Sequence, residues 1–502
     1  MNSKIGTVDQ YVERYIFFVE RRYQKDEKFK KKVLEALQKI AVPPKALNVY
    51  PLDSPYLGCL AFAVTTEANS SDPAWKLSRK FAKSLRNPVK VFSDIDDNLL
   101  EMSWVERAKT LPWLNAERRR SSSELSNGGR RDGLSIPQHD LRPRDLNHGR
   151  KNQRDLRTNE IGVKGYGKSG RLTEMRQLSQ PPGVSEAELG NLFRNYEFAG
   201  NGQVVYVIDT GFDPTIPELS DVKFDDWIYA GPFPTDEKGI QMTTKWHGTI
   251  VVSKVAGKIT GVAQEAKIVA IEAGDGRSID TFEAEGWIDG LLKTYDHIRR
   301  VNSDKNCIVN ISFGFGLGYF DILWAANPRF TIADGIRSYF WDSILYVLNE
   351  FTRLPNVVIV SGAGNGRKNT PIDTFPAIFA QRLKSNRMVV VGGVDKSGLN
   401  YYQKADFVKV WAPARDLAYP CEPGRVDKRP TEFLREHGLC FSVSGTSFAA
   451  PTVAGILATM LSAGVPLNQV VNHMYSLAYP RVPGGPNIVY NGISTKQWKQ
   501  QR

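Results

Sequence analysis

Short apolar runs rich in β-branched residues recur through the carboxyl-terminal part of the chain and alternate with segments of helical periodicity. The clearest runs are Val204–Ile208, Ile268–Ala273, Ile308–Ile311, Val357–Val360 and Val389–Val391. Strands buried on both faces have this continuous pattern, and their alternation with helices is typical of a parallel sheet. The pattern therefore predicts an α/β domain in which helices cover both faces of a parallel sheet.

A different pattern precedes this domain. Tyr15–Val19 and Leu57–Thr66 are apolar runs that predict strands, whereas Lys25–Ile40 and Trp75–Leu85 carry apolar residues at helical spacing. Val89–Phe92 is a candidate closing strand. Strands and helices that alternate within about 100 residues predict a small α+β unit with its helices on one sheet face.

A segment of basic and small polar residues lies between the two units. Residues 107–176 hold 17 Lys and Arg against 8 Asp and Glu, which accounts for most of the net charge of +12. Such a composition cannot bury enough apolar surface to offset the entropy of ordering, so it predicts a disordered linker. A nucleic-acid-binding arm is the alternative, but Trp113 and Tyr166 are almost alone as candidates for base stacking. The expected organisation is a small unit at 1–105, a linker at 106–182, an α/β domain at 183–493 and a tail at 494–502.

Length and composition exclude several protein classes. The 502 residues are 41% hydrophobic and 24% charged, which is ordinary for a globular protein and not for a fibrous or wholly disordered one. No apolar run approaches the roughly 18 residues that span a bilayer. Tyr15–Val19 is also too short for the apolar region of a secretory signal.

The chain has four cysteines, which are too few for a disulfide framework. Cys59 and Cys307 lie in apolar runs, and we expect them to be inert buried thiols. Cys421 and Cys440 bracket a loop that precedes a serine-containing segment, and they are a candidate pair.

Polar residues follow the predicted strands or open helices at four places, and the carboxyl ends of parallel strands are where sites form. Asp209 lies in VYVIDTG, His247 in HGT, Asn365 in SGAGNG and Ser447 in SGTSFAAP. Taken singly, each has a structural explanation as a turn aspartate, a packed histidine, a turn asparagine or a helix N-cap serine. Together they indicate catalysis, because a serine nucleophile needs a base and the base needs an orienting carboxylate.

The segments VYVIDTG, HGT, ISFG, SGAGNG and SGTSFAAP resemble the successive signatures of the subtilisin-like serine proteases, the subtilase family. The resemblance covers about residues 183–493, and it has that family's order of Asp, His, Asn and Ser. It implies a three-layer, parallel-sheet, subtilisin-like α/β fold and a serine endopeptidase. It also implies that Asp209, His247 and Ser447 form a catalytic triad and that Asn365 contributes to the oxyanion hole.

The same resemblance indicates how substrate is held. Ser312, Phe313 and Gly314 would line one side of a groove and Gly274 and Gly276 the other, so that exposed backbone pairs with an extended polypeptide. The enzyme that the resemblance implies requires no cofactor, and we assign no structural calcium site.

The small amino-terminal unit resembles the inhibitory prodomain found ahead of many subtilases. We expect it to act as an intramolecular inhibitor, released by a cut within Arg118–Arg131 or near Gln180. The resemblance suggests a secreted enzyme, whereas the amino terminus shows no signal peptide, so the location is left open. We expect no membrane association and no nucleic-acid partner.

Two features depart from the family pattern. Ile250–Ser253 replaces the second histidine and the small residues that usually follow the first histidine, which puts the packing of that helix in question. The interval from Ser312 to Asn365 is long, and its surplus around Leu317–Ile336 is a candidate lid or exosite.

Two other functions deserve comparison with a subtilase. The segment VIDTG also resembles pepsin-like aspartic proteases, but those need a second such carboxylate in an all-β fold, and no second DTG or DSG occurs. A catalytically impaired, subtilase-like binding module would have lost a triad residue or Asn365, and all four are present.

Overall fold

The structure is a computed structural model. It describes residues 11–19, 23–40, 47–68, 99–104, 162–231, 246–274, 284–314, 334–383, 385–422 and 431–500. The helix expected at Trp75–Leu85, the strand expected at Val89–Phe92 and the basic segment up to residue 161 lie outside the described residues. So do Gly276 and most of the expected insertion at Leu317–Ile336.

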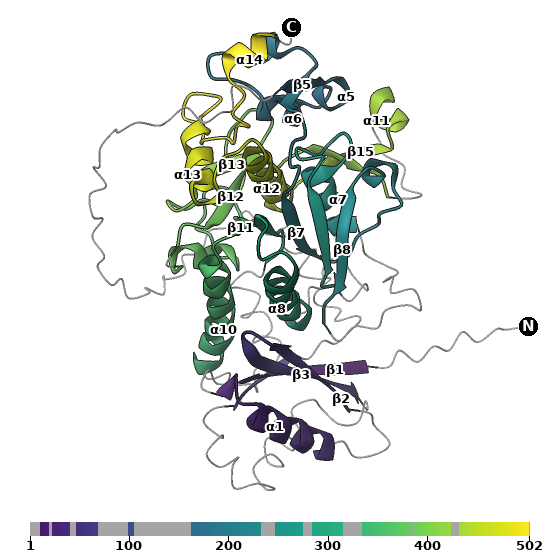
Figure 1. Ribbon diagram of the computed structural model, residues 1–502, viewed down its shortest axis with the longest axis vertical. Helices are drawn as coiled ribbons and strands as arrows, with labels where there is room; N and C mark the ends of the chain where they lie inside the picture. Colours follow the sequence, from purple (N-terminus) through teal and green to yellow (C-terminus); the bar gives the residue numbers. More distant parts are fainter. Residues whose placement is uncertain are drawn as a thin grey trace, which may run out of the picture.

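The described elements form a small amino-terminal unit and a larger α/β unit (Figure 1). The strands are β1 (Tyr11–Val19), β2 (Leu47–Ser54), β3 (Gly58–Ala68), β4 (Leu99–Trp104), β5 (Val163–Tyr166), β6 (Phe193–Tyr196), β7 (Val204–Asp209), β8 (Lys223–Tyr229), β9 (Lys267–Glu272), β10 (Cys307–Ile311), β11 (Val357–Gly362), β12 (Met388–Val394), β13 (Val410–Pro413), β14 (Leu417–Pro420) and β15 (Leu439–Val443). The helices are α1 (Glu27–Ile40), α5 (Gly167–Gly170), α6 (Thr173–Leu178), α7 (Trp246–Ala256), α8 (Ala284–Val301), α10 (Asp334–Arg353), α11 (Glu432–Glu436), α12 (Thr446–Ser462), α13 (Leu467–Leu477) and α14 (Thr495–Gln500).

A seven-stranded sheet in the order β13-β12-β11-β10-β7-β9-β8 forms the centre of the α/β unit. Every neighbouring pair in it is parallel, as the continuous apolar runs predict. Each of the six residues of β7 is buried, which is typical of a strand covered on both faces. The chain order reverses around β7, and such a switch point opens a crevice at the carboxyl ends of the strands.

Alternate residues of these strands enter two separate cores, and this confirms the three-layer arrangement. Val205 and Val207 of β7 pack in one core with helices α7 and α12, whereas Val204 and Tyr206 pack in the other with α8 and α10. Helix α12 is buried along nearly its whole length. Helix α7 is buried as well, so the bulky Ile250–Ser253 segment fits within the core.

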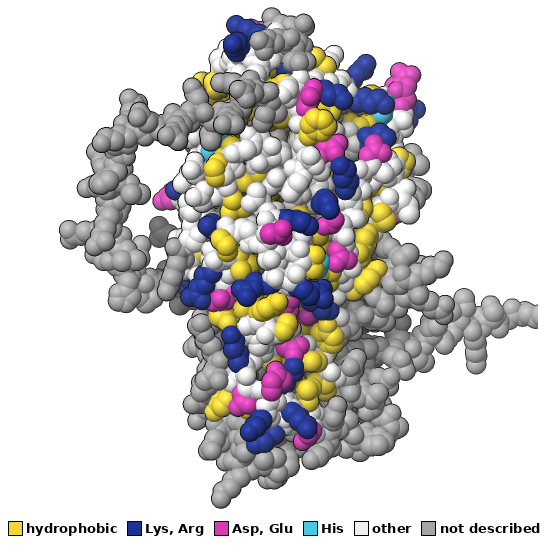
Figure 2. All heavy atoms as spheres, in the orientation of Figure 1, with side chains coloured by type: hydrophobic (Ala, Val, Ile, Leu, Met, Phe, Trp, Pro, Cys, Tyr) yellow, Lys and Arg dark blue, Asp and Glu magenta, His cyan; other side chains and the backbone are white. Residues whose placement is uncertain are grey.

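The amino-terminal unit is an antiparallel sheet in the order β2-β3-β1-β4 with helix α1. It lies beside α8 and α10 (Figure 1). Leu52 and Leu60 belong to the same apolar core as Trp287 and Leu291 of α8, so the two units share buried surface. Figure 2 shows basic and acidic side chains of the described residues interspersed on this face of the molecule.

Residues 162–182 are folded against the α/β unit, although the sequence analysis assigned them to the linker. Strand β5 pairs with β6, and the carbonyl oxygen of Gln180 accepts a hydrogen bond from Tyr479 Oη at 2.7 Å. The carbonyl of Leu178 accepts from the backbone N–H of Asn491 at 3.0 Å. These are long-range contacts that a local composition cannot reveal.

The carboxyl terminus also differs from the expected tail. Residues 495–500 form α14, and Trp498 is fully buried with the Arg194 guanidinium 4.4 Å from its ring centre. A buried Trp with a cation over its ring anchors this segment to the domain.

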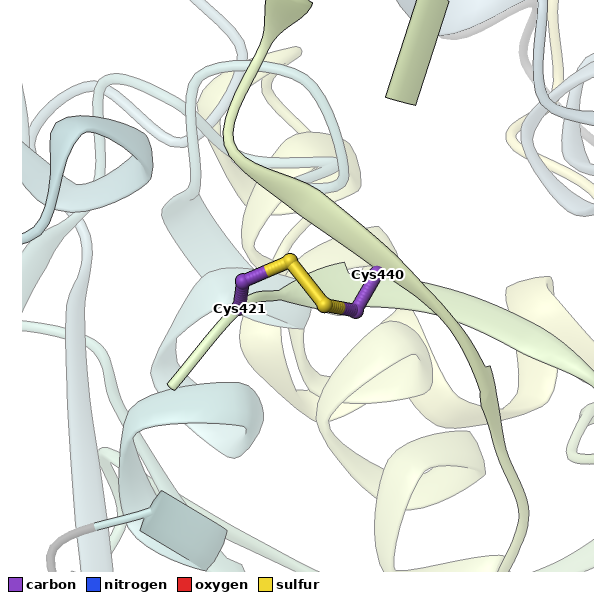
Figure 3. The surroundings of a disulfide bond; sticks show 2 residues. All are labelled: Cys421 and Cys440. Carbon is purple, nitrogen blue, oxygen red and sulfur yellow. A yellow bond between two sulfur atoms is a disulfide. The ribbon is translucent and has the colours of Figure 1, made fainter. Parts of the chain in front are cut away.

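Cys421 and Cys440 form a disulfide, which confirms the candidate pair (Figure 3). Cys59 and Cys307 are free and buried, also as expected, and burial raises the pKa of each thiol to about 12. Within the described ranges no single helix is long and apolar enough to cross a membrane. Helices α12 and α13 taken together are long and apolar enough by length and composition, but the pair is bent by 118°.

Candidate active site

The carboxylate of Asp209 lies at the carboxyl end of β7 and is completely buried. Its Oδ1 accepts hydrogen bonds from the backbone N–H of Thr210 at 2.8 Å and from His247 Nδ1 at 2.8 Å. Its Oδ2 is buried and has no hydrogen-bond partner among the described residues. A buried carboxylate is costly unless it has a partner, and here the imidazole is that partner.

His247 lies in the first turn of α7, and its side chain is 20% exposed. Burial lowers its pKa, but the charge and the hydrogen bond of Asp209 outweigh burial, so the pKa of His247 stands above its ordinary value. The bond through Nδ1 leaves the other ring nitrogen free to serve a reacting group.

The packing around Gly248 explains why a glycine follows His247. A Cβ at this position would lie 2.3 Å from the carbonyl oxygen of Gly211 and 3.1 Å from Asp209 Cβ. Only a residue without a side chain lets the start of α7 approach the loop after β7 this closely. The HGT motif is therefore a packing requirement of the Asp209–His247 pair as well as the source of the imidazole.

Ser447 lies in the first turn of α12 and is partly exposed. The ring of the next residue, Phe448, lies 5.4 Å from the ring of His247, measured between centroids. The histidine therefore packs against the first turn that carries the serine. Ser447 Oγ and the second ring nitrogen of His247 make no hydrogen bond to any described residue, and such bonds often tighten only when substrate is bound.

Asn365 follows β11 and is oriented by Thr446. Its Oδ1 accepts hydrogen bonds from the backbone N–H of Thr446 at 2.8 Å and from Thr446 Oγ1 at 3.0 Å. A Cβ on Gly445 would meet Asn365 Nδ2 at 3.4 Å and Ser447 Oγ at 3.6 Å. The amide donor and the hydroxyl thus flank the same small space beside Gly445. Sequence reasoning missed Thr446 as the residue that orients Asn365, although it lies inside the GTS motif.

The expected groove residues that the structure describes follow strands β10 and β9. Ser312, Phe313 and Gly314 follow β10; Ser312 Oγ accepts from Asn310 Nδ2 at 2.8 Å, and Phe313 packs edge-on against Trp287. Gly314 is exposed, and a Cβ there would lie 1.8 Å from the carbonyl oxygen of Phe375.

Gly274 follows β9, and a Cβ there would meet the carbonyl oxygen of Thr210 at 2.6 Å. It therefore borders the loop that carries Asp209, whereas its expected companion Gly276 is outside the described residues. Among the described residues, no group of three or more His, Cys, Asp or Glu is arranged to hold a metal ion.

A protein-family model matches the part of the chain that holds these residues. Residues 200–470 match the model of the Subtilase family. The chain belongs to this family. As a subtilase it is a serine-type endopeptidase, and its substrates are polypeptides.

Individual relatives of this subtilase are distant. It is 28% identical over 329 residues to Subtilisin-like protease 5 of Arthroderma gypseum, covering 63% of this chain and 69% of that protein. It is 28% identical over 320 residues to Subtilisin-like protease 2 of Trichophyton rubrum, covering 60% of this chain and 61% of that protein.

Solved structures similar to this subtilase include fervidolysin from Fervidobacterium pennivorans, described as a keratinolytic enzyme related to subtilisin. The TM-score is 0.48 at 18% identity, over 99% of this chain and 62% of fervidolysin. A cold-adapted subtilisin-like serine proteinase gives a TM-score of 0.44 at 18% identity, over 64% of this chain and 99% of that one.

Proposed function

We propose that this subtilase cleaves peptide bonds with Ser447 as the nucleophile, His247 as the general base and then acid, and Asp209 as the group that orients the imidazole. The observation that carries the proposal is the 2.8 Å contact between His247 Nδ1 and Asp209 Oδ1 beside the helix turn of Ser447. A carboxylate at Nδ1 fixes the tautomer whose second nitrogen accepts a proton.

The proposed reaction proceeds in two halves. Ser447 Oγ attacks the carbonyl carbon while its proton passes to His247, and the imidazolium then gives that proton to the departing amine. The resulting acyl-enzyme is hydrolysed when His247 takes a proton from a water molecule that attacks the ester. The free acid leaves, and Ser447 regains its proton. Asp209 stabilises the imidazolium in both halves, which its complete burial strengthens.

Asn365 is the proposed oxyanion donor, together with the backbone N–H of Ser447. Thr446 holds the amide oxygen, which turns Nδ2 towards the space beside Gly445. Donors that are fixed before the reaction stabilise the developing oxyanion without a cost of reorganisation. The backbone of Ser312–Gly314 and of Gly274–Gly276 is proposed to pair with an extended substrate on either side.

The amino-terminal unit is the proposed intramolecular inhibitor. Tyr50 Oη donates a hydrogen bond to Asp289 at 2.8 Å, and the Arg299 guanidinium lies 4.8 Å from the ring centre of Tyr56. With the shared apolar core, these contacts support a unit that stays docked until the connecting chain is cut. Because residues 162–182 are part of the fold, we expect the cut upstream of Val163 rather than near Gln180.

The test compares hydrolysis of an unstructured polypeptide by the wild type, Ser447→Ala and Ser476→Ala, each after separation from the amino-terminal unit. Ser476 is an exposed serine of α13 and serves as the matched control. We expect full activity in the wild type and Ser476→Ala, and a loss of at least about 10³-fold in Ser447→Ala. Equal activity in all three proteins, or binding without cleavage by the wild type, would contradict the proposal.

A further inference from the structure

A buried lysine lies behind the proposed base. Lys254 is in α7, seven residues and so about 10 Å along the helix axis from His247. It is 2% exposed, and its Nζ donates a hydrogen bond to the backbone oxygen of Ala418 in β14 at 2.6 Å. Burial lowers the pKa of Lys254, although the carboxylates of Glu174 and Glu218 act in the opposite direction. An apolar side chain would avoid the desolvation cost, so the hydrogen bond to β14 is the feature to explain.

Ala418 is held from a second side as well. Its backbone N–H donates to Glu174 Oε1 of α6 at 3.0 Å. The pairing of β14 with β15 is irregular between Leu417 and Ala418, and a bulged residue leaves the regular ladder of backbone hydrogen bonds. The buried Lys254 and the half-buried Glu174 therefore bond the carbonyl and the N–H of one strand residue.

The chain just before Ala418 holds the segment that leads to the nucleophile. The backbone N–H of Gly445 donates to the carbonyl of Ala414 at 2.8 Å, and the backbone N–H of Asp416 donates to Ser444 Oγ at 3.0 Å. Ser442 Oγ donates to Asp416 Oδ1 at 2.8 Å. Hydrogen bonds joined by short stretches of backbone thus link the helix of His247, through Lys254 and β14, to Gly445 at the start of α12.

We propose that Lys254 and Glu174 are positioning residues of the active site: Lys254 fixes β14 relative to α7, Glu174 fixes β14 relative to α6, and together they set the approach of His247 to Ser447. This inference rests on the proposed catalytic roles of His247 and Ser447. Neither charged group touches the reacting atoms. Their effect is on geometry, and a displacement of about 1 Å in a catalytic pair can cost about 10²-fold in rate.

Glu218, the second carboxylate whose charge acts on Lys254, has a purely structural role. Its Oε1 accepts hydrogen bonds from the backbone N–H groups of Ile259 and Thr260, just after the end of α7. It touches neither β14 nor β15 through a hydrogen bond among the described residues. Glu218 therefore stabilises the turn after α7, whereas Lys254 and Glu174 act on β14.

The experiment expresses the full chain of the wild type and of four variants. Each protein is then separated from the amino-terminal unit in the same way. Lys254→Met and Glu174→Ala each remove one bond to Ala418. Glu174→Gln keeps an acceptor oxygen for the same N–H but removes the charge, and Lys258→Met removes an exposed lysine four residues after Lys254, which pairs with Asp221 at 3.1 Å. Thermal unfolding gives the folded fraction of each variant. The kcat is calculated per folded molecule, and KM is measured in the same assays.

We expect kcat to fall about 10–100-fold in Lys254→Met and Glu174→Ala, with KM changed less than about threefold. Glu174→Gln and Lys258→Met should stay near the wild type. The acid-limb midpoint of the pH profile should not move, because the Asp209–His247 contact is intact.

If Lys254→Met and Glu174→Ala lower only the melting temperature and keep kcat per folded molecule, the two residues are merely structural and the inference is wrong. Should Lys254→Met fail to fold, Glu174→Ala with its Glu174→Gln partner decides the question. A Ser447→Ala enzyme run alongside distinguishes the two proposals. If it is as active as the wild type, the proposed triad fails, and the positioning roles fail with it.

Discussion

His247 Nδ1 lies 2.8 Å from Asp209 Oδ1, and this contact joins the start of α7 to the end of β7. The glycine after the histidine permits that approach, since a Cβ there would meet Gly211 and Asp209. The pair is thus built by backbone packing before any substrate arrives, and most of the expected behaviour of the enzyme follows from it.

Replacement of Asp209 should reveal the electrostatic part of this relationship. In Asp209→Asn the charge that raises the pKa of His247 is lost while burial, which lowers it, remains. The base must be neutral to act. The acid limb of kcat/KM should therefore lie above the ordinary histidine pKa of about 6.5 in the wild type and move to lower pH in the variant.

The same variant should lose about 10⁴-fold in kcat, a magnitude carried over from other serine proteases. A pH–rate series on a peptide substrate measures both effects. An unmoved acid limb would mean that a group other than His247 titrates in the reaction.

Asn365→Ala should reduce kcat by about 10²–10³-fold with little change in KM, because the lost donor acts on charge that exists only in the transition state. That magnitude was itself established on a subtilisin, so it is inherited by family membership. Asn349→Ala on α10 is the matched control, because among the described residues its amide donates only to Leu345 of its own helix. A variant that raises KM instead would place Asn365 in ground-state binding.

Gly445→Ala should abolish activity while the domain stays folded. The added methyl group would enter the space between Asn365 Nδ2 and Ser447 Oγ, and the φ of 156° lies at the edge of the region that favours glycine. Gly464→Ala is the control, because it also has a positive φ, of 89°, but meets open space at the other end of α12. That variant should lose about 1–2 kcal/mol of unfolding free energy and keep its turnover. Phosphonate labelling and thermal unfolding separate the two effects.

Asp296 of α8 should make the docking of the amino-terminal unit depend on pH. Burial, with the nearby charges of Asp53 and Asp289, raises the pKa of Asp296 to about 6, although its hydrogen bond from Ser54 opposes this. A group whose pKa is raised in the folded state stabilises that state at low pH. The contribution should be complete below about pH 4 and lost as the pH rises through about 6.

Asp296→Asn keeps an oxygen that accepts the hydrogen bond from Ser54, and it should remove this dependence of stability on pH. The measurement is thermal stability of the full chain between pH 4 and 7. A slope that persists unchanged in the variant would assign the effect to another group.

The sequence predicts the interior of this fold better than its edges. Strands β7, β9, β10, β11 and β12 are all marked by buried β-branched runs, whereas the edge strand β8 reads KFDDWIY and is largely exposed or half-buried. β13 at the other edge has only four residues. Edge strands lack the two-sided burial that creates the pattern.

The site divides in a similar way. Asp209, His247, Asn365 and Ser447 follow from motifs, because each chemical role demands one residue type at one place. Glu174 and Lys254 could not be predicted, since their partner Ala418 contributes only backbone atoms and lies far away in the sequence. The basic composition around Glu174 predicts a linker, and only the contacts made by residues 162–182 overturn that expectation.

The most direct test of the account is mass-spectrometric mapping of the adduct formed by a serine-directed phosphonate on the active enzyme. The reagent requires a hydroxyl activated by a neighbouring base, so it reports nucleophile and base in one measurement. The account predicts a single modified site, Ser447, with labelling abolished in Ser447→Ala and strongly slowed in His247→Ala. An adduct on another residue, or no adduct on an enzyme freed of its amino-terminal unit, would contradict it.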